Sequence, residues 1–180
     1  MDKPILYIDC DGTTYDTIPV AFEMMADMGC NMQDQLEKNY YFREVLDWRE
    51  IFKYAKPINN SIERIMELKE SGIFEDVKGL TALCGAKYEE SCKYERYDRD
   101  LPGIEVITVS MHVPKSSVIN PRNSVLIDDS WFNCYDMNKN GGVGVKFVQG
   151  QCNLKQNIIN DLGDVTETEG VKRLLRTRNF

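Results

Sequence analysis

The sequence lacks long hydrophobic runs, paired cysteine motifs and any excess of basic residues. No apolar stretch approaches the roughly 18 residues that a membrane span requires, so we expect no transmembrane segment. The N-terminal residues MDKPILYIDCDG carry an acid at position 2 and aspartates at positions 9 and 11, where a secretory signal would be basic and then apolar. A cytoplasmic location is the expectation that follows.

The cysteines, the histidine and the charge exclude further classes of function. The six cysteines are scattered without a CxxC pair, and the single histidine, His112, is not clustered with them. This spacing disfavours a structural zinc site and favours reduced thiols. The formal net charge of -7 disfavours binding to long nucleic acid, which lysine and arginine drive. A small anionic ligand is still compatible, provided that a local cation neutralises its site.

The chain of 180 residues is long enough for one well-buried domain. Short apolar runs alternate with helical patterns, which is typical of an α/β fold with a doubly wound, Rossmann-like parallel sheet. Thr17 is expected to cap the first helix, and Asn60 with Glu63 resembles a capping box. Strands are expected at residues 4–8, 77–83, 104–110, 123–128 and 142–148, and helices at 17–28, 33–38, 43–55, 61–70, 87–97, 153–163 and 171–178.

Two aspartates directly follow the first strand, in the stretch ILYIDCDGTTYD. An Asp-Gly pair is a common hairpin signal, but the residues after Gly12 have helical spacing, so this turn leads from a strand into a helix. In open α/β sheets, ligands bind beyond the carboxyl ends of the strands. Asp9 and Asp11 are therefore candidate site residues.

Other polar residues follow the later strands, namely Thr81, Lys115, Asp128 and Asp129. Taken singly, each has an ordinary explanation as a strand filler, a surface charge or a turn. Together they occur in chain order at successive strand ends, as a phosphate site requires.

Four short motifs carry a resemblance to a known family. ILYIDCDGT, LTA, the lysine of VPKSSVI and VLIDDS resemble the four motifs of the haloacid dehalogenase (HAD) superfamily of phosphohydrolases, over residues 4 to 148. The resemblance implies that Asp9 is the nucleophile, that Asp11 is the acid/base, and that Thr81 and Lys115 hold phosphoryl oxygens.

The same resemblance implies a Mg²⁺ site. Its ligands would be Asp9, the backbone carbonyl of Asp11 and Asp128, with Asp129 as an alternative or partner to Asp128. Hard oxygen ligands suit Mg²⁺, and a carboxylate can form an acyl phosphate that divides one hard step into two. Two unit charges about 4 Å apart interact by about 4 kcal/mol at an effective dielectric of about 20, so an uncompensated acidic cluster would repel a phosphate.

The substrate is the least determined part of this interpretation. Dehalogenase-type members lack an acid two residues after the nucleophile, so Asp11 favours the phosphatase and phosphomutase branch, in which hydrolysis is the commoner outcome. VLIDDSWFNC with the later GGVGVKF resembles the 5'(3')-deoxyribonucleotidase-like branch, although Ala82 and Leu83 replace its usual Ser-Pro pair. We expect a small-molecule phosphomonoester, with nucleoside monophosphates favoured and sugar phosphates as the alternative.

Residues 17–72 resemble the helical cap that HAD enzymes insert at this point, leaving residues 1–16 and 73–180 as the core. The aromatic residues of this stretch have two interpretations: a platform that stacks a nucleobase, or the cap's own core, which is the commoner role. They are Phe22, Tyr40, Tyr41, Phe42, Trp48, Phe52 and Tyr54.

Two other functions use similar residues. A phospho-accepting signalling module also combines an aspartate, Mg²⁺, a threonine and a lysine, but there the acidic pair precedes the acceptor, whereas here Asp128 and Asp129 follow Lys115. A silent binding domain is disfavoured because all the motif residues that turnover needs are present. His112 could touch a phosphate, but a lone loop histidine is usually a surface residue. The oligomeric state is left open.

Overall fold

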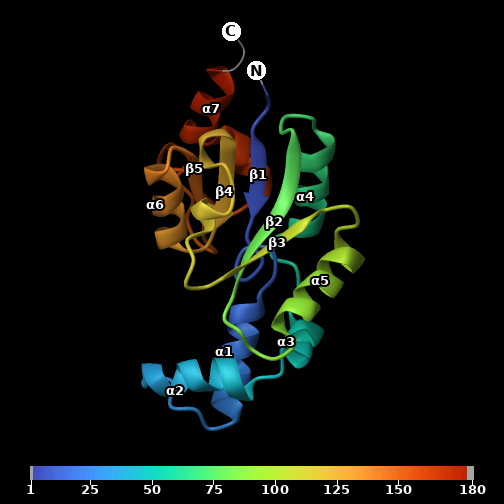
Figure 1. Ribbon diagram of the computed structural model, residues 1–180, viewed down its shortest axis with the longest axis vertical. Helices are drawn as coiled ribbons and strands as arrows, with labels where there is room; N and C mark the ends of the chain where they lie inside the picture. Colours follow the sequence, from blue (N-terminus) through green and yellow to red (C-terminus); the bar gives the residue numbers. More distant parts are fainter. Residues whose placement is uncertain (1, 178–180) are drawn as a thin grey trace.

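The protein, described here by a computed structural model over residues 2–177, is built on one sheet of six parallel strands (Figure 1). Their order across the sheet is β3-β2-β1-β4-β5-β6. The strands are β1 (Ile5–Ile8), β2 (Asp76–Leu83), β3 (Val106–Ser110), β4 (Ser124–Asp128), β5 (Val143–Phe147) and β6 (Ile158–Ile159). The expected doubly wound, Rossmann-like α/β fold is confirmed.

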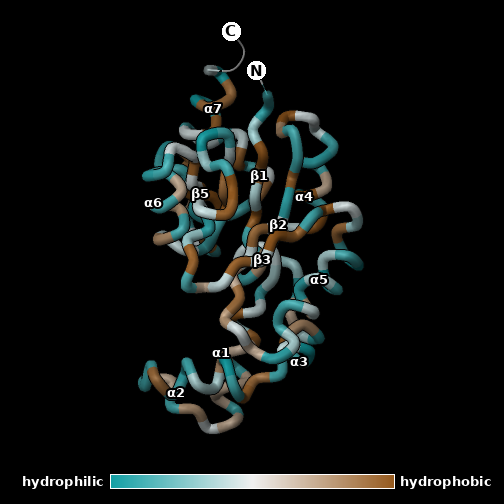
Figure 2. Tube along the Cα trace, viewed as in Figure 1, coloured by the Kyte–Doolittle hydropathy of each residue, from teal (hydrophilic) through white to brown (hydrophobic). Residues whose placement is uncertain are grey.

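Helices cover both faces of the sheet because successive strand side chains point to opposite faces. Leu6 and Ile8 of β1 belong to the large core that includes residues of α4 (Ser61–Glu70), α5 (Glu89–Asp100) and α7 (Glu169–Arg176). Tyr7, between them, packs in a smaller cluster with Met137 of α6 (Trp131–Lys139). Figure 2 shows hydrophobic residues along the strands and hydrophilic residues along the outer helices.

The chain between β1 and β2 forms most of the structure beyond the carboxyl ends of the strands (Figure 1). It contains α1 (Thr17–Asp27), α2 (Gln35–Tyr40), a π-helical turn (Tyr41–Val45) and α3 (Trp48–Tyr54), before α4 returns and packs against β2. The division into a core of residues 1–16 and 73–180 and a cap of 17–72 stays a prediction. Within residues 2–177, no helix has the combination of length and hydropathy needed to cross a bilayer.

The predicted cap of α1 is wrong, and the predicted cap of α4 is confirmed in position but not in its hydrogen bonding. The residue that precedes α1 is Asp16, and Thr17 lies inside the helix, where its hydroxyl donates a hydrogen bond to Asp11. Asn60 does precede α4, but its backbone is left-handed, with φ 57°, and its side chain makes no capping bond. Contacts with the β1 turn decide both helix starts, since Ser61 likewise donates its hydroxyl hydrogen bond to the Thr14 carbonyl.

The C-terminal part differs most from the sequence expectation. Residues 153–163 were expected to be helical, yet they contain a 3-10 turn (Leu154–Gln156) and strand β6, with a second 3-10 segment (Leu162–Glu167) beginning at their end. Ile158 and Ile159 pair with β5 as an edge strand instead of forming a helix, although the spacing of apolar residues predicts a helix. A helix is confirmed at α7, although position 178 of the predicted range lies outside the described residues. The sequence pattern did not indicate α6.

Candidate active site

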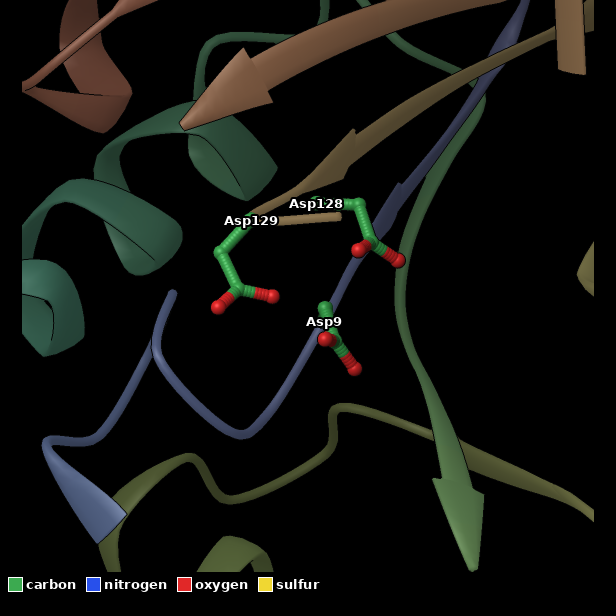
Figure 3. A group of neighbouring side chains, drawn as sticks. All are labelled: Asp9, Asp128 and Asp129. Carbon is green, nitrogen blue, oxygen red and sulfur yellow. The ribbon is translucent and has the colours of Figure 1, made fainter. Parts of the chain in front are cut away.

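The structure brings three aspartates together at the carboxyl edge of β1 and β4. These strands are neighbours with Ile8 opposite Ile127, so Asp9 and Asp128 leave the sheet side by side. Asp129 follows directly, and the three carboxylates offer oxygen atoms that all lie within 4.8 Å of one another (Figure 3). The strand order reverses at this position, which is where open α/β sheets bind ligands.

Lys115 lies between two of these carboxylates. It begins a 3-10 turn (Lys115–Ser117) in the loop between β3 and β4. Its Nζ is 2.6 Å from Asp9 Oδ1 and 2.7 Å from Asp128 Oδ2, and the side chain is only 3% exposed. Burial alone would lower the pKa of Lys115, but the charges of Asp9 and Asp128 raise it above its usual value. The ammonium group therefore stays charged inside the acidic cluster.

The acids exceed the positive charge that the chain supplies around them. Burial raises the pKa of Asp9 to about 8; Lys115 opposes this rise, and the charges of Asp128, Asp11 and Asp129 add to it. Burial, followed by the charge of Asp128, raises the pKa of Asp129 to about 6. Crowded, buried carboxylates of this kind are stabilised in their ionised form by an added cation.

Hydrogen bonds fix the orientation of Asp128. The Ser130 backbone amide donates to Oδ1 at 2.8 Å, and the Asn133 side-chain amide donates to Oδ2 at 2.9 Å. Ser130 also caps α6 by accepting a hydrogen bond from the Asn133 backbone amide. The start of α6 thus holds Asp128 in place.

The turn after β1 passes close to Asp129. Gly12 has φ +72°, and a Cβ atom there would lie 2.4 Å from Asp129 Oδ2. A side chain at position 12 would therefore be strained and would displace the carboxylate. Lys146 donates to the Asp129 backbone carbonyl and so holds the same residue from β5.

Asp11 has different partners from Asp9. Its Oδ2 is 2.6 Å from Lys93 Nζ, and its Oδ1 accepts a 2.7 Å hydrogen bond from the Thr17 hydroxyl. Thr81, expected to act with Lys115, is fully buried and accepts a 3.1 Å hydrogen bond from Lys93 instead. Of the residues predicted from sequence, the structure joins Asp9, Lys115, Asp128 and Asp129 directly, and it links Asp11 to Thr81 through Lys93.

Lys93 is the site residue that the sequence did not indicate. It lies on α5, is fully buried, and also contacts Glu89 at 3.0 Å and the Ala82 carbonyl at 2.8 Å. Burial alone would lower the pKa of Lys93, but Asp11 and Glu89 help to raise it above its usual value. The available signal was the four-residue spacing from Glu89 to Lys93, which usually marks an exposed helical ion pair.

Some of the aromatic residues between β1 and β2 pack against one another, and others are exposed. Trp48 lies edge-on to Phe42, with ring centroids 5.5 Å apart, and it also contacts Phe52. Trp48 and Phe52 are buried, which fits their interpretation as core residues. Phe22, Tyr40 and Tyr54 are exposed.

The parallel sheet carries the aspartate cluster at its switch point. No protein-family model and no curated protein sequence matches the chain. Solved structures match it in fold. A haloacid dehalogenase-like family hydrolase from Xanthomonas campestris aligns with TM-score 0.65 and 14% identity, over 97% of this chain and 93% of that one.

Two other structures bear on the chemistry of the fold. A HAD-hydrolase from Bacillus subtilis, bound to magnesium, aligns with TM-score 0.57 and 12% identity, over 93% of this chain and 98% of that one. L-2-haloacid dehalogenase from Xanthobacter autotrophicus, with chloropropionic acid covalently bound, aligns with TM-score 0.58 and 12% identity, over 99% of this chain and 100% of that one. The chain therefore has the fold of HAD-superfamily hydrolases, and these comparisons do not support the narrower deoxyribonucleotidase-like branch.

Proposed function

We propose that the protein is a Mg²⁺-dependent phosphatase that hydrolyses small phosphomonoesters through an aspartyl phosphate on Asp9. One observation carries the proposal: the Lys115 ammonium lies between Asp9 and Asp128, with Asp129 beside them. A nucleophilic carboxylate beside a fixed cation is what attack on an anionic phosphoryl group requires.

The residues present fit a divalent metal ion. Asp9, Asp128 and Asp129 supply hard oxygen atoms that lie within 4.8 Å of one another, and Asp11 adds a fourth carboxylate nearby. Lys115 pairs with Asp9 and Asp128, and Lys93 pairs with Asp11 and Glu89, so each lysine is shared by two carboxylates. Asp9, Asp128 or Asp129 and the Asp11 carbonyl would hold Mg²⁺, which usually keeps some waters. When bound, the ion would stabilise the charge of the transferring phosphoryl group.

In the proposed reaction, an Asp9 carboxylate oxygen attacks phosphorus, and the bond from phosphorus to the leaving oxygen breaks. The motif resemblance assigns the proton transfers to Asp11, whose carboxylate contacts Lys93 and Thr17 in this structure: it donates a proton to the leaving oxygen and then takes one from the water that hydrolyses the acyl phosphate. Lys115 balances the charge of Asp9 and the phosphoryl oxygens. Asn133 and Ser130 keep Asp128 oriented. Thr81 is assigned to a phosphoryl oxygen by the motif resemblance alone.

Phosphate release tests this proposal. The purified protein is assayed with p-nitrophenyl phosphate, nucleoside 5'- and 3'-monophosphates and sugar phosphates, with Mg²⁺ or with EDTA. We expect Mg²⁺-dependent turnover that Asp9→Asn abolishes while its circular dichroism spectrum stays unchanged. Turnover by Asp9→Asn at the parental rate would refute the mechanism.

Two further measurements separate the alternatives. A phospho-accepting signalling module would take up phosphate from acetyl phosphate on Asp9 and release it without multiple turnovers. A dehalogenase would release chloride from L-2-chloropropionate. The substrate panel also decides between nucleoside monophosphates and sugar phosphates.

A further inference from the structure

A cavity of about 370 Å³ opens beside Lys115, between the loop that follows β3 and the start of α6. Lys115 and Asn133 line it, and both also contact Asp128. The cavity therefore adjoins two residues that contact the aspartate cluster, although none of the three aspartates lines it. Its volume lies at the small end of the range of about 300–1,000 Å³ that is usual for small-molecule sites.

The charge of this cavity is unlike that of the molecule as a whole. Its charged or basic lining residues are Lys115 and His112, and none of the described residues lining it is acidic. Four other cavities, on the surfaces of α3, α4 and α5, are each lined by at least one glutamate or aspartate. In a chain of net charge -7, a cavity whose lining has no acids adds no repulsion to a substrate whose phosphoryl group lies at Lys115.

The mouth of the cavity is apolar and faces solvent. Met111, Val113 and Phe132 line it, and these side chains are 47%, 41% and 67% exposed. Arg43, from the π-helical turn, reaches the same rim, with its Nη2 3.2 Å from Met111 Sδ. Convergence of exposed apolar side chains with a few polar groups is typical of a ligand site.

We propose that this cavity binds the alcohol part of the substrate, and that it selects phosphomonoesters whose alcohol part carries a planar ring. The inference rests on the proposed function, because it places the phosphoryl group at Lys115 and Asp9. The ring then packs on Phe132, flanked by Met111 and Val113, while His112 supplies a polar contact at the rim. Aryl phosphates and nucleoside monophosphates share this chemistry, and glycerol phosphate lacks it.

Phe132→Ala tests the inference, with Tyr135→Ala as the matched control. Tyr135 lies on the same helix and is equally exposed, at 66%, but it does not line the cavity. Each variant is assayed with phenyl phosphate, adenosine 5'-monophosphate and glycerol phosphate. We expect Phe132→Ala to lower kcat/KM about tenfold for at least one ring-bearing substrate, mainly by raising KM, because losing an apolar contact in a pocket costs about 10–200-fold.

The expected pattern has two further parts. Phe132→Ala should leave glycerol phosphate hydrolysis within twofold, and Tyr135→Ala should leave all three substrates unchanged. Whether phenyl phosphate or the nucleotide is the more affected shows which source of the ring the cavity accepts. Thermal melts of both variants check that these exposed positions do not affect folding.

Several results would overturn the inference. An equal loss with ring-bearing and glycerol substrates would show that Phe132 has no role in selecting a ring. So would wild-type protein that prefers glycerol phosphate, or equal effects of the two variants. A dimer in light scattering that Phe132→Ala dissociates would assign the apolar rim to an interface between copies. If no substrate releases phosphate, the proposed function fails first, whereas turnover of glycerol phosphate alone refutes only the ring site.

Discussion

Two of the buried lysines, Lys115 and Lys93, occupy similar electrostatic positions in different surroundings. Each pairs with one aspartate of the β1 turn at 2.6 Å, Lys115 with Asp9 and Lys93 with Asp11. Each also pairs with a second carboxylate, Asp128 or Glu89. In both cases a buried lysine ammonium lies between two carboxylates.

Their surroundings separate their roles. Lys115 comes from a loop at the carboxyl edge of the sheet and lines the cavity beside the aspartate cluster. Lys93 is enclosed by protein: its Nζ contacts Thr81, the Ala82 carbonyl and Glu89, and the Trp48 ring centroid lies 5.0 Å away. This contrast assigns charge compensation for substrate to Lys115, and support of Asp11 and of the α3–α5 packing to Lys93.

The largest expected effect is a loss of stability when Lys93 is replaced. Lys93→Met leaves Asp11 and Glu89 without their buried cation, and breaking such a pair costs about 3–5 kcal/mol of unfolding free energy. Urea denaturation at pH 7 measures the change. The control is Lys87→Met, at an exposed lysine before α5, for which a change within about 0.5 kcal/mol is expected. A loss under about 1 kcal/mol for Lys93→Met would contradict a supporting role.

On the other side, Lys115→Met should chiefly reduce catalysis. Removing one preorganised group that stabilises transition-state charge costs about 10²–10³-fold in rate, so we expect a loss of that size in kcat/KM at saturating Mg²⁺. Lys139→Met, at an exposed position on α6, is the control. If the loss stays within tenfold, the contrast between the two lysines breaks down.

An intermediate effect on stability is expected from Mg²⁺ binding at the aspartate cluster beside Lys115. Mg²⁺ at about 100 times its dissociation constant should raise the free energy of unfolding by about 2.7 kcal/mol. Asp128→Asn should remove this gain, because it takes one carboxylate from the cluster, while Asp98→Asn on the exposed face of α5 should retain it. Equal stabilisation of both variants would mean that the ion binds elsewhere.

The smallest expected effect is a pH-dependent loss of stability when Asp100, at the end of α5, is replaced. Burial opposes ionisation of Asp100, but hydrogen bonds from Arg99 and Arg96 hold its pKa below the usual value. A lowered pKa in the folded state stabilises the fold above about pH 4 and loses that contribution as pH falls further. Asp100→Asn should cost about 1 kcal/mol at pH 7 and progressively less toward pH 3.

Urea denaturation of wild-type protein and Asp100→Asn at several pH values tests this window. Asp98→Asn, two residues away and exposed, is the control. A difference between wild type and Asp100→Asn that grows below pH 4 would show the opposite sign and refute the assignment.

Much of the fold could be predicted because the strands follow from short apolar runs. All five expected strands occur in the parallel sheet. The failures lie where tertiary contacts outweigh local pattern. Residues 158 and 159 complete the sheet edge as β6, and Thr17 donates its hydroxyl hydrogen bond to Asp11 rather than capping α1.

The sequence by itself placed Asp9, Asp128 and Asp129 at the ends of strands and Lys115 in a loop after a strand, which puts all four at the carboxyl edge of a parallel sheet. The strand order, with β1 beside β4, brought them together. Tertiary structure alone decided that Lys93 is buried against Asp11, that Thr81 contacts this lysine, and that an acid-free cavity opens beside Lys115. The reason is physical: chain direction is set by local pattern, whereas burial and cavities depend on which segments, distant in sequence, pack against one another.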